Sequence, residues 1–204
     1  MEIRCPLVAI LLDRCILAVE VMRVTSLGAQ ESARLERRTV RTVMSYIEEY
    51  LEFLSIPSVS ALPEHKKDIE RAAEWLKTRM ERAGIEDAQV IHTKGHPVVY
   101  GHARSRRPHA KTVVIYGHYD TQPADPLDEW RSGPFQPEIR DGKVYARGAA
   151  DDKGGVFPAL VAVEEMLRSG DLPVDVKFLF EGEEEIGSPS LKELLVQRKD
   201  LFAA

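Results

Sequence analysis

Val-Asp-Val-Lys-Phe-Leu-Phe-Glu-Gly-Glu-Glu-Glu, residues 174–185, is the stretch that decides the fold of this chain. Its apolar first half, 174–180, predicts a strand that is buried on both faces. Four glutamates follow within five residues, at 181 and 183–185. Like charges this dense raise one another's pKa unless cations or hydrogen-bond donors neutralise them. A solvated acidic turn is the ordinary alternative, but the position directly after a buried strand favours a functional use of these carboxylates.

Two further polar clusters follow predicted strands in the same way. Gly-His-Tyr-Asp at 117–120 comes after the apolar run 113–116, and Ala-Asp-Asp-Lys-Gly at 150–154 comes shortly after Val144 and Tyr145. Ligands in open α/β sheets bind beyond the carboxyl ends of the strands. One histidine and several carboxylates at that place predict a site for a divalent metal. For 151–152 the alternative is a solvated helix start, where aspartate favours the helix dipole.

Helical and strand-like patterns alternate along the rest of the chain, which predicts an α/β layered domain. The spacing of apolar residues predicts helices over 46–54, 69–80 and 155–168, and a last helix with Ser188 as N-cap and Pro189 as its first residue. Strands are predicted at 89–92, 98–102, 112–116 and 174–180, and an ordered loop at 121–142. Pro158 is acceptable in its helix if it lies in the first turn.

Residues 1–43 do not share this pattern, and we expect them to lie outside the fold, which would occupy 44–204. The apolar run that begins at Leu7 is interrupted by Asp13 and Arg14, so it is too short to span a membrane. A signal peptide and an over-extended start are both open interpretations. The domain boundary near Met44 is therefore an expectation from pattern alone.

Composition excludes several classes of protein. The 204 residues carry a net charge of −5 with 44% apolar residues, which is typical of a globular domain without a nucleic-acid or membrane surface. The basic residues within 104–111 are predicted to form a solvated loop. The two cysteines, Cys5 and Cys15, both lie in the leader, so no disulfide framework is expected. We expect a cytoplasmic protein.

The polar clusters have a chemical logic as a metal centre. A metal-binding imidazole usually donates its second ring N–H to a carboxylate, and Asp120 could lie beside His118 because residues i and i+2 of an extended chain point the same way. Asp151 or its neighbour could bridge two cations. In the run 183–185, one glutamate could bind metal while the next acts as general base during attack on a carbonyl.

These motifs resemble one known family. Residues 117–120, Ala-Arg-Gly-Ala-Ala-Asp-Asp-Lys-Gly at 146–154 and Glu-Gly-Glu-Glu-Glu-Ile-Gly-Ser at 181–188 are similar to the acetylornithine deacetylase, succinyl-diaminopimelate desuccinylase, aminoacylase and carnosinase family of co-catalytic zinc peptidases. Asp-Pro-Leu-Asp-Glu-Trp at 125–130 resembles its dipeptidase branch. The resemblance runs from about Tyr46 to Leu195 and implies a three-layer α/β/α catalytic domain.

The resemblance also implies roles for individual residues. His118 would bind one zinc ion, Glu185 the second, and Asp151 would bridge the two; manganese or cobalt could replace zinc. Glu184 would be the general base, and Asp120 would serve catalysis by orienting His118. Substrates would be dipeptides or N-acyl amino acids, cleaved at the amide bond by metal-activated water.

The departures from the family matter as much as the match. Its members have a further acidic ligand, a histidine ligand near the C-terminus, and a smaller domain for substrate binding and dimerisation. We expect none of these within 204 residues, so the chain is interpreted as the N-terminal part of a catalytic domain that is incomplete at its C-terminus. A homodimer is expected only for the full-length parent. One alternative is an inactive fragment that keeps the fold, and the other is a deacetylase or desuccinylase of N-acyl amino acids. We expect the isolated chain to bind zinc weakly.

Overall fold

The computed structural model describes residues 29–202, with side chains described for residues 42–202. Predictions that concern residues 1–28 lie outside this described part. Helix α2 (Ala29–Leu54) begins within the segment assigned to the leader, and Val43 packs against the main core. The boundary near residue 44 stays a prediction.

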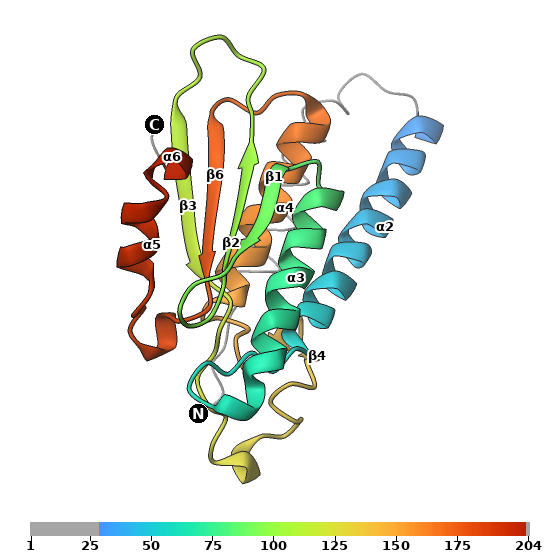
Figure 1. Ribbon diagram of the computed structural model, residues 1–204. Helices are drawn as coiled ribbons and strands as arrows, with labels where there is room; N and C mark the ends of the chain where they lie inside the picture. The colour runs from blue at the N-terminus through green and yellow to red at the C-terminus, as the bar shows by residue number, and fades with distance from the viewer. Residues whose placement is uncertain (1–28, 203–204) are drawn as a thin grey trace.

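The centre of the fold is a mixed sheet with the strand order β1-β2-β6-β3 (Figure 1). Its strands are β1 (Glu86–Ile91), β2 (Val98–Ala103), β3 (Thr112–His118) and β6 (Asp175–Glu181). The pairs β1–β2 and β2–β6 are antiparallel, whereas β3 runs parallel to β6 with His118 opposite Glu181. This parallel pair brings the ends of two predicted strands, and the clusters that follow them, to one edge of the sheet.

Helices cover both faces of this sheet, which confirms the predicted three-layer α/β arrangement. On one face α3 (Lys66–Arg82) and α4 (Lys153–Ser169) pack against the strands, with α2 beside α4 (Figure 1). The short helices α5 (Leu191–Gln197) and α6 (Lys199–Phe202) lie on the other face. None of the helices described between residues 29 and 202 combines the length and the apolar character that a membrane crossing requires.

Two apolar clusters hold the layers together. The larger one lies between the sheet and α2, α3 and α4, and includes Phe53, Phe157 and Phe178, all wholly buried. The smaller one lies under α5 and α6, where Leu194 contacts the cluster that includes Tyr100 and Leu179. The continuous apolar run of β6 is explained by this double burial, because its two faces contribute to the two clusters.

Three short 3-10 segments and a small ribbon complete the structure. The segments are η1 (Pro63–His65), η2 (Leu127–Glu129) and η3 (Glu184–Ile186). The ribbon pairs β4 (Glu138–Arg140) with β5 (Lys143–Tyr145). The prediction of loop throughout 121–142 was therefore wrong at its C-terminal end, where β4 forms.

Two local predictions about helices were also wrong. The helix predicted after Ser188 is α5, which begins at Leu191 with Ser190 as its N-cap, while Ser188 has a φ of 52° and lies before it. The reason is a competing local turn: the Ser188 N–H donates to the backbone oxygen of Glu183 and its hydroxyl donates to Glu181, so this residue belongs to the preceding turn. Helix α4 begins at Lys153, so Pro158 lies beyond the first turn of the helix.

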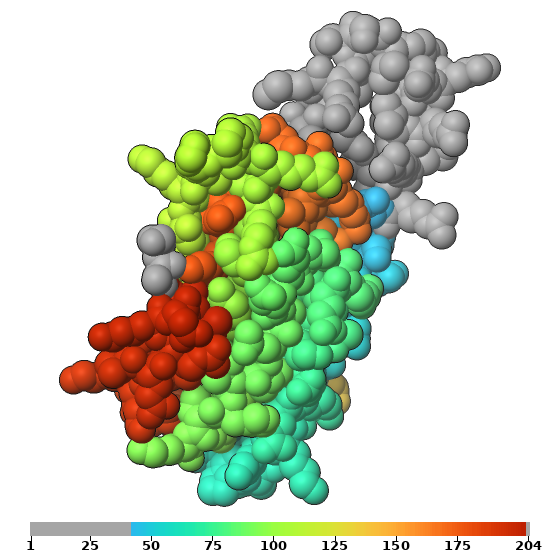
Figure 2. All heavy atoms as spheres, turned by 45° about the horizontal axis from the view of Figure 1, so that its top comes forward, coloured from blue at the N-terminus to red at the C-terminus, as the bar shows by residue number. Residues whose placement is uncertain are grey.

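The loop with the basic residues lies at the end of the sheet opposite the carboxyl ends of β3 and β6. Figure 2 shows it in light green on the face turned toward the viewer. Arg104 pairs there with Glu86 and Asp87, and Arg107 pairs with Asp171 at 2.6 Å. Most of this loop is exposed, as its composition predicts.

A buried arginine joins the three helices of the larger layer. Arg79 of α3 donates to Glu49 of α2 at 2.6 Å and to Glu164 of α4 at 2.5 Å, and its side chain is 3% exposed. Removing the partner of a buried carboxylate strongly destabilises a protein, because the negative charge then stays in the interior without compensation. These ion pairs therefore fix how the helices pack together.

Replacing Arg79 with leucine is expected to lower the free energy of unfolding by about 3 kcal/mol, because Glu164 would stay buried with less compensation. The matched control is Arg71→Leu, on the same helix, whose side chain is 58% exposed and whose loss should cost less than about 0.5 kcal/mol. Urea unfolding followed by circular dichroism measures both. Equal stability of the two variants would contradict the structural role of Arg79.

Candidate metal centre

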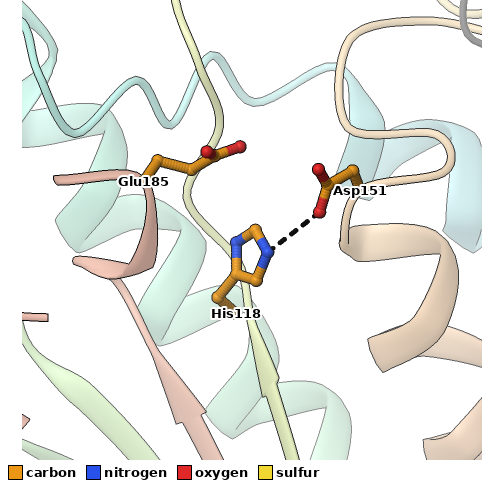
Figure 3. Close-up of side chains that lie close together, drawn as sticks. All are labelled: His118, Asp151 and Glu185. Carbon is orange, nitrogen blue, oxygen red and sulfur yellow. Dashed lines mark hydrogen bonds and ion pairs between the residues drawn. The ribbon is translucent and has the colours of Figure 1, made fainter. Parts of the chain in front are cut away.

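His118, Asp151 and Glu185 meet beyond the carboxyl ends of β3 and β6 (Figure 3). His118 is the last residue of β3, Asp151 lies in the loop before α4, and Glu185 lies in η3, directly after β6. The His118 Nε2 atom is 3.1 Å from Asp151 Oδ1, and one ligand atom from each residue lies within 4.8 Å of the others. The ligand atoms predicted from the sequence are thus brought together.

This donor set fits a zinc centre. Imidazole nitrogen and carboxylate oxygen are common zinc ligands at about 2.0–2.2 Å. Two ions in a shared site lie about 3.5–4 Å apart. Ligand atoms within 4.8 Å of one another are compatible with one ion among all of them or with two ions on either side of Asp151.

Asp120 links the two halves of this group. Its carboxylate is fully buried, with Oδ1 3.4 Å from His118 Nδ1, and its backbone oxygen lies 3.2 Å from the same nitrogen. The same carboxylate accepts the backbone N–H groups of Glu184 and Glu185 at 3.2 and 3.1 Å. One side chain therefore orients the imidazole and also fixes the turn that carries the two glutamates.

Glu184 lies beside the ligand group without being one of its members. Its Oε2 atom is 3.7 Å from His118 Nε2, and its side chain is 43% exposed. A carboxylate in this position can reach a water molecule at the centre while remaining open to solvent. This placement is compatible with the general-base role that the sequence predicts for it.

The electrostatic environment favours a cation. Burial by itself would lower the pKa of His118, but the hydrogen bond and charge of Asp120 and the charges of Asp152 and Glu184 raise it to about 9. Burial raises the pKa of Glu185, with the Asp151 charge adding to the effect. The surrounding negative charge thus favours a proton on the imidazole. The same negative charge would favour a metal ion in place of that proton.

The dense glutamates of 181–185 divide into two kinds. Glu181 accepts the hydroxyls of Tyr116 and Ser188, and Glu183 accepts the backbone N–H groups of His96 and Ser190. Hydrogen-bond donors thus serve these two carboxylates, which anchor the turn to neighbouring segments. Only the next two glutamates remain directed toward the candidate centre.

Two features of this site were missed in the sequence. Gln122 donates its side-chain N–H to Glu185 Oε2 at 2.8 Å and so orients that ligand, although no pattern around residue 122 indicates this contact. Gly95 lies close against Glu183: a Cβ there would come within 1.6 Å of Oε1, so the Glu183 side chain would have to shift. A glycine between Lys94 and His96 was a visible signal of close backbone approach.

The mixed sheet and this group of side chains together define a catalytic domain of the metallopeptidase type. Residues 114–203 match the peptidase family M20/M25/M40, so this part of the chain carries a domain of that family. It is 32% identical to a cysteinylglycine-S-conjugate dipeptidase of Corynebacterium striatum over 77% of this chain and 34% of that protein.

Solved structures agree with this assignment. The chain is similar to the M20 family metallo-carboxypeptidase Sso-CP2 from Sulfolobus solfataricus, with a TM-score of 0.71 and 40% identity over 76% of this chain and 35% of that one. Human carnosine dipeptidase 1 gives a TM-score of 0.73 at 29% identity, over 94% of this chain and 39% of that one. The chain thus spans little more than a third of the length of these relatives.

The raised pKa of His118 predicts a pH-dependent stability of the metal-free chain. The pKa is about 9 in the folded state against 6.5 for the free side chain, so folding favours the protonated ring. The stabilisation is fully present below about pH 6.5 and is lost as the pH rises through about 9. Urea unfolding in a chelator should show the advantage of wild type over His118→Gln shrinking across that range. A difference that stays constant or grows with pH would contradict this prediction.

Proposed function

We propose that this chain carries the metal-binding part of a zinc dipeptidase site. The observation that supports it most is the convergence of His118, Asp151 and Glu185 within 4.8 Å, with the carboxylate of Glu184 3.7 Å from His118 Nε2. In this proposal His118 would hold one ion and Glu185 a second, and Asp151 would be a ligand shared by both. Manganese or cobalt would suit the same oxygen and nitrogen donors.

The substrate class is proposed from the relatives. The bacterial relative is named as a cysteinylglycine-S-conjugate dipeptidase, and a structural relative as a carnosine dipeptidase. We infer that the complete protein cleaves the amide bond of a dipeptide. Removal of an acyl group from an N-acyl amino acid is the second candidate, because it breaks the same kind of bond. A cytoplasmic location and a dimeric parent stay predictions.

The residues of the chain divide the chemical work as follows. Zinc, when bound, lowers the pKa of water and polarises the substrate carbonyl. Glu184 takes the proton from the attacking water and returns it to the leaving amine. Asp120 keeps the imidazole of His118 in position and holds the backbone of Glu184 and Glu185, so the base and these two ligands share one support.

The number of ligands limits what the chain can do alone. If two ions bind, His118 with Asp151 and Asp151 with Glu185 give each ion two ligands from the described residues, whereas catalytic zinc usually has three protein ligands. We therefore expect weak zinc binding and very slow turnover by the 204-residue chain. A chain that keeps the fold and the metal but has no turnover is the corresponding alternative.

Zinc titration by calorimetry tests the ligand set. We expect His118→Ala and Glu185→Ala each to weaken zinc binding at least about tenfold, and Glu184→Gln to bind as wild type does, because that change removes no ligand. The stoichiometry distinguishes one ion from two. Unchanged affinity in both alanine variants would overturn the proposed centre.

Hydrolysis of cysteinylglycine and β-alanylhistidine with added zinc tests the reaction. Any turnover by wild type is expected to disappear in Glu184→Gln, because the base that accepts the proton of water is then lost. Equal zinc-dependent turnover by the two proteins would exclude Glu184 as the base. Zinc binding without any turnover would favour the alternative of a metal-binding but inactive chain.

A further inference from the structure

Lys153 is a wholly buried lysine close to the candidate metal centre. It is the first residue of α4 and follows Asp151 by two positions. Its Nζ atom donates to the backbone oxygens of Phe53 at 3.1 Å and Ile56 at 2.7 Å, at the C-terminal end of α2. It also lies 4.8 Å from the centre of the Phe53 ring. Burying a cation is costly, so an apolar residue would be the simpler choice for packing alone.

A second contact attaches the same loop to α2. The hydroxyl of Tyr50 donates to the backbone oxygen of Ala149 at 2.8 Å in a buried position. Gly154 lets the helix start approach this oxygen, because a Cβ there would lie 2.2 Å from it. The loop that carries Asp151 is thus held on both sides, through Ala149 before it and Lys153 after it.

The arm that carries His118 is attached to the same part of the chain. Ser58 donates its hydroxyl to the backbone oxygen of Tyr119 at 2.6 Å, and its own backbone oxygen accepts the N–H of Thr121 at 2.9 Å. Residues 53–58 therefore contact both arms of the centre. The two arms, whose ligand atoms His118 Nε2 and Asp151 Oδ1 are 3.1 Å apart, thus contact one common segment.

We propose that Lys153 is a positioning residue that holds Asp151 opposite His118 for metal binding. This inference rests on the proposed metal centre. Lys153 acts through the backbone: its side chain is directed to α2, away from the ligand atoms, and it fixes the point at which the Asp151 loop enters α4. Functional groups held by such supporting contacts keep the geometry that metal binding requires.

The test is Lys153→Met, which keeps a long side chain but removes the ammonium group that donates both hydrogen bonds. The matched control is Val163→Ala, a core change on the same helix and about 15 Å farther along it, which destabilises without touching the Asp151 loop. Zinc affinity is measured by competition with a chromophoric chelator, at a temperature where circular dichroism shows each protein folded. The visible spectrum of bound Co²⁺ reports the ligand geometry independently.

We expect Lys153→Met to bind zinc about 10–100-fold more weakly than wild type and to change the Co²⁺ spectrum, whereas Val163→Ala should stay within about twofold. Wild-type affinity and spectrum in folded Lys153→Met, or an equal loss in the control, would overturn the inference. If Lys153→Met does not fold, Tyr50→Phe is measured instead, because it removes the hydrogen bond to Ala149 without changing the charge. A weaker zinc affinity in Tyr50→Phe supports the inference, and wild-type affinity overturns it. Failure of wild type itself to bind zinc would instead overturn the proposed metal centre.

Discussion

The parallel pairing of β3 with β6 is the constraint on which the rest of the site depends. It places His118 opposite Glu181 at the carboxyl ends of both strands, so the histidine and the acidic turn necessarily share one edge of the sheet. The loop before α4 then needs only to bring Asp151 to the same edge. On its other side β6 pairs with the antiparallel strand β2, and apolar clusters cover both of its faces, which explains why its sequence is apolar almost throughout.

Two different interactions offset the electrostatic repulsion among the crowded carboxylates. Backbone and hydroxyl donors satisfy Glu183 and, on one oxygen, Glu181, and Asp120 accepts two backbone N–H groups. Asp151, Glu184 and Glu185 are left facing His118, whose pKa is raised by the surrounding negative charge. A cation bound by His118 would replace the proton on the ring, because a metal-binding imidazole is neutral, and would bring positive charge to the same carboxylates.

The sequence allowed the α/β class and the candidate ligands to be predicted, because buried strands and the polar residues at their ends are local patterns. The supporting contacts could not be predicted, since their partners are remote: Glu183 is 87 positions from His96, and Lys153 is 97 positions from Ile56. The start of helix α5 was misplaced for another reason, since the partners of Ser188 are close in the chain. Ser188 is a good N-cap by local rules, but its hydrogen bonds to the acidic turn decide its conformation.

The central claim is that this group of side chains binds metal, and anomalous diffraction at the zinc edge from crystals of the chain grown with zinc tests it most directly. The account predicts anomalous density between His118, Asp151 and Glu185, which crystals of His118→Ala grown in the same way should lack or show much reduced. Zinc density found only elsewhere on the molecule, or undiminished density in the variant, would contradict it.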